Sequence, residues 1–299
     1  MTSVRRAMRH WKPHGMVDAL SLAGHLSAGV LDYYLNPWTQ RQRCMSPPDH
    51  DTIAATLSRA GVTVKPYSID LIDFQQWLDL VSFPEKYQRQ CGAIFKEKAL
   101  EHYVGAKLLS IQPGDVLIDV ASSNSPWSEM AERAYECSAY ALDLCFKRGI
   151  HGRRIGADAT AMPLPDGWAN GMALHCSFEM FEGTADIDLI PEAQRVLKPG
   201  GRMVILPLYL HDAYFAYSSP LSDRRGLDYQ GAARVWRDDE WPVRFSRKYS
   251  VDSFVERIVS ALGSMKLTVY VMQNETQVAS NCYLKFAALF EKPVTGDSQ

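Results

Sequence analysis

The sequence predicts an α/β protein with a mostly parallel central sheet of Rossmann-like type and helices on both of its faces. From residue 112 onward, short apolar runs alternate with helix-like segments, the pattern of chains that build βαβ units. The last two apolar runs, 266–273 and 281–291, are separated by only about seven residues. Because this is too short for a crossover helix, we expect these two strands to be antiparallel to each other.

Residues 1–110 are expected to form a helical segment in front of the sheet domain. Helical periodicity predicts four helices, over 16–34, 51–60, 68–81 and 84–109. The loop 46–49, Ser-Pro-Pro-Asp, is typical of a helix start. The segment could serve as a lid, as a dimer surface or as both, and the sequence leaves these alternatives open.

Residues 111–292 are expected to form the sheet domain, followed by a flexible tail over 293–299. Within the domain the apolar runs predict strands at 116–120, 139–142, 154–157, 171–175 and 202–208. Helices are predicted at 126–135, 187–196 and 250–262, the last with Ser250 as its N-cap. Residues 209–249 interrupt the alternation with an aromatic-rich insert.

Composition excludes several classes of function. Hydrophobic residues make up 46% and charged residues 22% of the 299 residues, and the net charge is −2. A nucleic-acid partner is not expected, because such binding needs clustered Lys and Arg. The six cysteines include no C-x-x-C pair, so no metal site is predicted. The apolar run 16–35 contains Asp18, His25 and Asp32, so no membrane span is expected, and free thiols favour the cytoplasm.

The turn after the first predicted strand of the sheet contains no glycine. It reads Ala121-Ser122-Ser123-Asn124-Ser125. A dinucleotide fingerprint needs glycines here so that the backbone can approach a pyrophosphate, which argues against NAD or FAD. Asn124 tolerates a positive φ better than most residues, while Ser125 and Pro126 suit a helix start. The free N–H groups of that helix start could bind a carboxylate instead of a phosphate.

Acidic residues stand at the ends of three successive predicted strands. They are Asp119, Asp143 and Asp158, and the first two are 24 residues apart, close to the spacing at which an acid meets ribose hydroxyls. S-adenosylmethionine carries an amino-acid end instead of a pyrophosphate. Asp119 could accept from its ammonium group, Asp143 from the ribose and Asp158 from the adenine amino group.

These segments resemble the class I SAM-dependent methyltransferases of the type 11 kind. The resemblance covers roughly 112–292 and rests on VLIDVASSNS, YALD, GADATAMPLPD and EAQRVLKPGGRMVIL. It implies a cofactor site of S-adenosyl-L-methionine built from Asp119, Ala121, Ser122, Ser123, Asn124, Asp143, Leu144, Asp158, Ala159 and His175. The chain departs from the family in its glycine-free turn, and in Met180, where many relatives have a histidine.

Acceptor-side residues are expected after the fourth and fifth strands. Glu179 and His211 are the predicted general bases, because a hydroxyl acceptor must lose a proton. Tyr209, Tyr214 and Trp236 of the insert are predicted to bind the acceptor, since aromatic rings suit sugar faces and planar molecules. On the helix before the first strand, Lys98 and His102 share a face. Tyr103 lies beside them and is predicted to cover the cofactor.

The function predicted from these features is methyl transfer from S-adenosylmethionine to a small-molecule or glycan acceptor, at a hydroxyl oxygen. Three alternatives stay open. One is a non-catalytic binding or scaffold protein on the same fold, for which the glycine-free turn would be the sign. A nicotinamide-dependent oxidoreductase is disfavoured by the turn, and a nucleic-acid methyltransferase by the lack of a basic stripe. A homodimer also stays open.

Overall fold

The protein is described by a computed structural model that covers residues 24, 47–219, 222, 226–230, 234–237 and 243–294. Apart from Gly24, the helix predicted over 16–34 lies outside the described residues, as do residues 295–299 of the predicted tail. None of the helices in the described ranges combines the length and the apolar character needed to cross a lipid bilayer.

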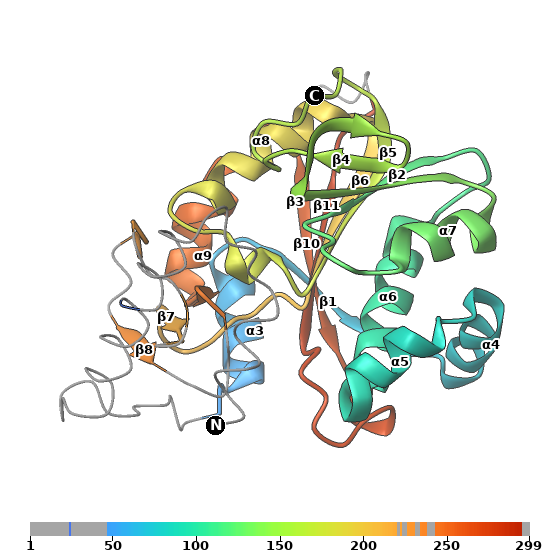
Figure 1. Cartoon of the computed structure of the whole chain (residues 1–299). Coiled ribbons are helices and arrows are strands. Elements are labelled where there is room, and N and C mark those ends of the chain that lie inside the picture. The colour runs from blue at the N-terminus through green and yellow to red at the C-terminus, as the bar shows by residue number, and fades with distance from the viewer. Residues whose placement is uncertain are drawn as a thin grey trace.

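An eight-stranded sheet forms the centre of the molecule (Figure 1). Its strand order is β1-β10-β11-β6-β5-β2-β3-β4. The strands are β1 (Thr63–Tyr67), β2 (Val116–Val120), β3 (Ser138–His151), β4 (Arg154–Gly156), β5 (Ala169–His175), β6 (Leu197–Leu206), β10 (Lys266–Met272) and β11 (Phe286–Glu291). β11 is antiparallel to both of its neighbours, β6 and β10. The predicted fold class and the antiparallel final pair are therefore confirmed.

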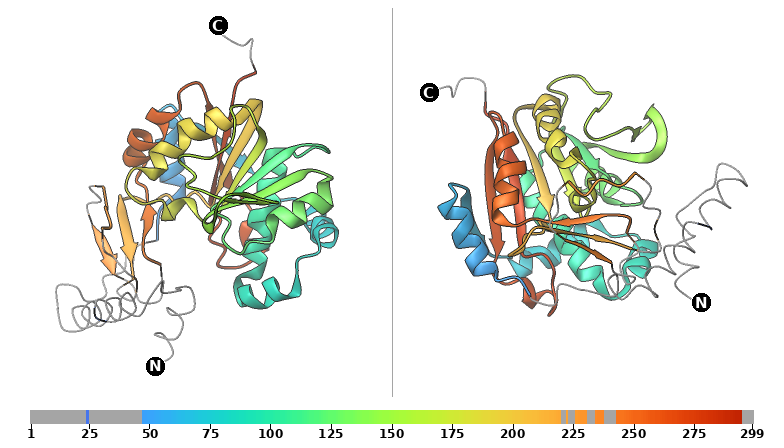
Figure 2. Two further views of the ribbon diagram at one scale, coloured as in Figure 1. Left: turned by 45° about the horizontal axis from the view of Figure 1, so that its top comes forward. Right: turned by 90° about the vertical axis from the view of Figure 1, so that its left-hand side faces the viewer.

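Helices cover both faces of this sheet (Figures 1 and 2). One face carries α3 (His50–Arg59), α8 (Ala185–Val196) and α9 (Val251–Arg257). The other carries α4 (Leu71–Val81), α5 (Glu85–Cys91), α6 (Phe95–Leu109) and α7 (Trp127–Tyr135). Short 3-10 helices are η2 (Gly92–Ile94), η3 (Phe178–Met180), η4 (Val259–Ala261) and η5 (Glu275–Gln277).

Alternating side chains of the central strands supply two separate hydrophobic cores. On β6, Met203 and Ile205 pack with the α3, α8 and α9 side, whereas Val204 and Leu206 pack with the α4, α6 and α7 side. All four side chains are fully buried. A strand buried on both faces reads as a continuous apolar run, which is why the sequence pattern locates these strands well.

The N-terminal part of the chain is not wholly helical, which corrects the prediction for residues 1–110. Residues 63–67, Thr-Val-Lys-Pro-Tyr, form β1, which pairs parallel with β10 and so extends the main sheet. The stretch 84–109 is also broken, because Gly92, with φ of 56°, separates α5 from α6. The start of α3 is as expected, because Asp49 caps it by accepting from Thr52 N at 3.1 Å. The expected start of α7 was wrong: Pro126 is its N-cap and not its first helical residue, and this residue provides no side-chain cap.

The aromatic-rich insert contains a second, three-stranded sheet in the order β8-β7-β9. Its strands are β7 (Phe215–Ser218), β8 (Val235–Arg237) and β9 (Ser246–Lys248), and the chain enters β7 from the carboxyl end of β6. This small sheet lies beside the main sheet, on the side of α3 and α9 (Figure 1). It brings the insert close to the edge at which the parallel strands end.

Candidate functional site

Three strand-end carboxylates lie along one edge of the main sheet. In the parallel register Asp119 of β2 stands next to Ala141 of β3, and Asp143 of β3 stands next to Gly156 of β4. Asp158 follows β4 by two residues. Asp119 is buried, at 2% exposure, whereas Asp143 is half-buried and Asp158 is exposed. The register expected from the sequence is therefore present, and it leaves two of the three acids accessible.

The glycine-free turn adopts left-handed backbone at two residues. Ala121 has φ of 54° and Ser123 has φ of 48°. The turn is fixed to the end of β3, because Ser122 N donates to Leu142 O at 3.1 Å and Ser123 N donates to Asp143 Oδ2 at 2.7 Å. Asn124, which the sequence favoured for a positive φ, does not have one, and that prediction was wrong. The two residues that do have a positive φ are an alanine and a serine, which rarely adopt this conformation.

Replacing Ala121 with glycine is expected to raise the free energy of unfolding by about 0.5–1 kcal/mol. The left-handed region costs an L-residue about 1–2 kcal/mol, and the larger backbone entropy of glycine in the unfolded chain offsets part of that relief. The matched control is Ala55→Gly, the same change at an exposed position inside α3, which is expected to lower stability by about 1 kcal/mol. Chemical denaturation measures both. Equal destabilisation by the two changes would contradict the strain at Ala121.

Aromatic and imidazole rings pack together at the buried end of this edge, between α6, α7 and β5. His102 stacks on Trp127, with centroids 5.4 Å apart and planes within 10°, and its ring lies 4.2 Å from that of His175. His175 Nδ1 is 3.4 Å from Asp119 Oδ1. Burial, and then the neighbouring His175, hold the pKa of His102 well below its usual range, so its imidazole is neutral.

Some buried polar atoms of this cluster are available to bind a ligand or water. Among the described residues Asp119 Oδ2, His175 Nε2 and His102 Nδ1 have no hydrogen-bond partner. Buried polar groups are normally paired, since an unpaired one costs about 1–3 kcal/mol. An unpaired carboxylate oxygen suits an ammonium group, so this end of the edge can accept the amino-acid part of a cofactor.

The predicted base Glu179 lies in η3, just after β5. Its carboxyl group is buried; Oε1 is 3.5 Å from the Cys176 thiol, and Oε2 has no partner among the described residues. Cys176 also lies 3.7 Å from the hydroxyl of Tyr209. Burial raises the pKa of the Glu179 carboxyl, while the nearby Lys248 ammonium acts in the opposite direction. The predicted base His211 is buried and accepts from Ala213 N at 3.2 Å through Nδ1.

A cavity of about 410 Å³ adjoins these residues. It lies between the start of α3, the segment after β6, the small sheet and the loop before β11. The lining residues used below are Tyr209, His211, Phe215, Tyr217, Lys248 and Tyr283. Two predicted site residues, Tyr209 and His211, are thus brought together at this cavity.

Other predicted residues have structural partners. The Tyr103 hydroxyl donates to Asp73 Oδ2 of α4 at 2.6 Å, and its ring packs against Phe74 and Trp77. Ala159 belongs to the core, whereas Leu144 is 74% exposed beside Asp143. Trp236 of β8 packs edge-on against Phe215, a residue of the cavity wall.

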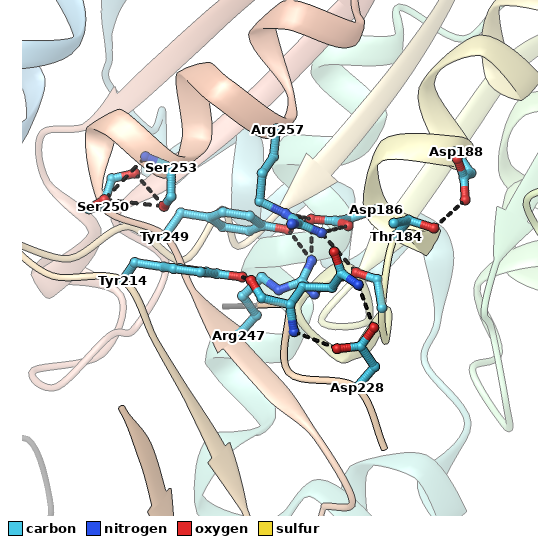
Figure 3. A network of polar contacts seen from close by, with 12 residues as sticks. Thr184, Asp186, Asp188, Tyr214, Asp228, Arg247, Tyr249, Ser250, Ser253 and Arg257 are labelled. Atoms are coloured by element: carbon cyan, nitrogen blue, oxygen red, sulfur yellow. Dashed lines mark hydrogen bonds and ion pairs between the residues drawn. The ribbon is translucent and has the colours of Figure 1, made fainter. Parts of the chain in front are cut away.

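Tyr214 belongs instead to a buried polar network that fastens the insert to the main domain (Figure 3). At its centre Asp186 of α8, fully buried, forms ion pairs with Arg247 of β9 and Arg257 of α9. Its Oδ2 also accepts from the Tyr249 hydroxyl at 2.6 Å. The Tyr214 ring stacks on Tyr249, with centroids 6.3 Å apart. The network fixes β9, and with it the neighbouring residue Lys248.

The sequence did not predict a role for Lys248 or the pairing of Lys98 with the buried Glu101. Lys98 Nζ lies 3.2 Å from Glu101 Oε1, and Glu101 also accepts from the Tyr283 hydroxyl. Lys98 and His102, which were predicted to share a helix face, make different contacts: Lys98 pairs with Glu101, and His102 packs in the ring cluster. A signal for Lys98 and Glu101 was their helical spacing of three residues, but nothing local marks Lys248.

Comparisons with known proteins find a partial sequence match to a methyltransferase. No protein-family model matches the chain. It is 31% identical over 124 residues to a demethylmenaquinone methyltransferase from Thermus thermophilus, a match that covers 40% of this chain and 53% of that protein. The chain therefore spans about half the length of this curated relative.

Solved structures that are similar to this chain include two methyltransferases. Geranyl diphosphate C-methyltransferase from Streptomyces coelicolor A3(2) has a TM-score of 0.45 at 14% identity, covering 84% of this chain and 100% of its own. The 1,6-didemethyltoxoflavin-N1-methyltransferase from Burkholderia thailandensis has a TM-score of 0.41 at 12% identity, covering 85% and 94%. The curated relative is a methyltransferase, which agrees with the resemblance drawn from the sequence.

Proposed function

We propose that this chain is a SAM-dependent methyltransferase that acts on a small-molecule acceptor. The observation that carries the proposal is the row of carboxylates Asp119, Asp143 and Asp158 at the carboxyl ends of three neighbouring parallel strands. Ligands of open α/β sheets bind at this edge. The partial match to a methyltransferase supports the same assignment.

The residues at this edge fit the parts of S-adenosylmethionine. Asp119 Oδ2, buried and unpaired among the described residues, can accept from the ammonium group. Asp143 uses one lone pair of each oxygen for Ser123 N and Cys145 N, so both oxygens can still accept from ribose hydroxyls. Asp158 is exposed and can accept from the adenine amino group. When bound, the cofactor would supply an electrophilic methyl group.

The acceptor would lie on the other side of this position, toward Glu179, Tyr209 and His211. We propose transfer to a hydroxyl oxygen, with Glu179 as the group that takes the hydroxyl proton. Its raised pKa makes it a stronger proton acceptor than an ordinary carboxylate. The dry surroundings of Glu179, at 5% exposure, would hold the reacting groups away from water.

Calorimetric titration of the full chain with S-adenosylmethionine, S-adenosylhomocysteine and NADH tests this function. We expect the first two to bind in the micromolar range and NADH not to bind, because the turn lacks the glycines that a pyrophosphate requires. A well-folded protein that binds none of the three would favour the scaffold alternative. Tight binding of NADH alone would replace the proposal with an oxidoreductase.

A further inference from the structure

The cavity beside Tyr209 has the size and the walls of a site for a small planar molecule. Its volume of about 410 Å³ lies in the range of small-molecule sites. Aromatic side chains supply much of its wall, from the segment after β6, from β7 and from the loop that leads into β11. They are Tyr209, Phe215, Tyr217, Tyr283 and Phe286.

Lys248 contributes a positive charge to this wall. It is the last residue of β9 and stands opposite Phe215 in the antiparallel pair with β7. Its Nζ lies 3.0 Å from the centroid of the Tyr209 ring. Within the described part of the chain, the Lys248 ammonium has no hydrogen bond and no ion pair with a carboxylate. The N–H donors that do not point at the ring can thus bind a ligand in the cavity.

Other lysines near the cavity are already neutralised. Lys285, which also lines it, forms an ion pair with Glu275, and Lys98 pairs with Glu101. Lys248 is therefore the lining cation that can pair with a ligand, as far as the described residues show.

The surroundings of Lys248 favour an anion in the cavity. Burial lowers the pKa of Lys248 from 10.5 to about 8, although the nearby Glu179 and Cys176 partly oppose this. A half-buried ammonium that packs on a ring face is poorly solvated, and a negative group beside it would favour the charged form. Such a group would gain charge-assisted hydrogen bonds from Nζ.

We propose that this cavity binds the methyl acceptor, and that the acceptor is a planar aromatic anion whose negative group pairs with Lys248. The identity of the ligand as an acceptor rests on the proposed methyltransferase function, whereas the site itself rests on the cavity and on Lys248. Aromatic walls select the flat ring system. The ammonium selects a carboxylate or phenolate over a neutral group of the same shape.

Two ligands of equal shape and different charge test the inference. We expect 2-naphthoate to bind the full chain at least about tenfold more tightly than the neutral 2-naphthamide, as measured by calorimetry without cofactor. In Lys248→Met this preference is expected to disappear through weaker binding of the acid, with binding of the amide unchanged. Lys248→Arg should keep the preference.

The matched control is Lys266→Met, which removes an exposed lysine from the lining of a separate cavity next to β1. It is expected to bind both ligands like the wild type. Equal affinity of the wild type for acid and amide, no binding of either, or an unchanged preference in Lys248→Met would each overturn the inference. The wild-type comparison decides even if the methionine variant does not fold.

Failure of this inference and failure of the proposed function give different results. Binding of S-adenosylmethionine without any preference for the acid would remove the assignment of the cavity alone. A preference for the acid without cofactor binding would leave an anion site on a protein that is not a SAM-dependent enzyme.

Discussion

Replacing Asp186 with alanine is expected to lower the free energy of unfolding by about 3–5 kcal/mol. The change removes the shared partner of Arg247 and Arg257, which are 0% and 8% exposed, and leaves both guanidinium groups without a carboxylate partner among the described residues. It also removes the acceptor of the Tyr249 hydroxyl. Removing one partner of a buried ion pair is strongly destabilising, because the remaining charge stays buried without its partner. The intact pair contributes far less than this when it is compared with a hydrophobic substitute.

Asp188 provides the matched control two residues away (Figure 3). It is exposed on the same helix, α8, and accepts from the Thr184 hydroxyl at 2.7 Å. Asp188→Ala is therefore expected to cost less than about 1 kcal/mol. Urea denaturation followed by circular dichroism measures both variants. An Asp186→Ala protein that loses no more stability than Asp188→Ala would show that the network does not hold the insert in place.

The contribution of Asp186 to the free energy of unfolding depends on pH. Burial alone would raise the pKa of Asp186, but hydrogen bonds from Arg257 and the charge of Arg247 outweigh it, so the pKa lies below the usual 3.8. A carboxyl group with a lowered pKa stabilises the fold fully above the unfolded value, and this contribution is lost as the pH falls through the lowered value. At neutral pH the contribution of Asp186 is therefore complete.

The sequence predicts the central strands well and the edge of the sheet poorly. Central strands such as 116–120 and 202–206 are buried on both faces, so they stand out as apolar runs. β1 carries Lys65 and Pro66 and is mostly exposed, as expected for an edge strand. What makes this segment a strand is its pairing with β10, about 200 residues away in the chain. No local sequence pattern can show such a pairing.

The strand-end acids could be located from the sequence, whereas the contacts of the insert could not, for a related reason. Strand-end acids follow from the strand pattern, because parallel strands bring their carboxyl ends to one edge. The conformation of the turn does not follow from local propensity: Ala121 and Ser123 are left-handed and Asn124 is not, in a turn that is bonded to Asp143 of the next strand through Ser123 N. Lys248 lies within the irregular insert, and only the folded chain brings it to Tyr209.

Replacing Asp143 with alanine is expected to weaken binding of S-adenosylhomocysteine by about 30- to 150-fold. This figure corresponds to about 2–3 kcal/mol, the loss of one or two hydrogen bonds between a carboxylate and ribose hydroxyls. The control is Asp115→Ala. Asp115 also accepts a backbone N–H bond, from Gln112 at 2.8 Å, but it lies at the opposite end of β2. That variant is expected to bind the ligand like the wild type.

Calorimetric titration of wild type, Asp143→Ala and Asp115→Ala with S-adenosylhomocysteine tests most directly whether the carboxyl edge of β2, β3 and β4 holds the cofactor. We expect a loss of affinity in Asp143→Ala alone, with all three proteins folded. Unchanged affinity in Asp143→Ala, or an equal loss in both variants, would contradict it.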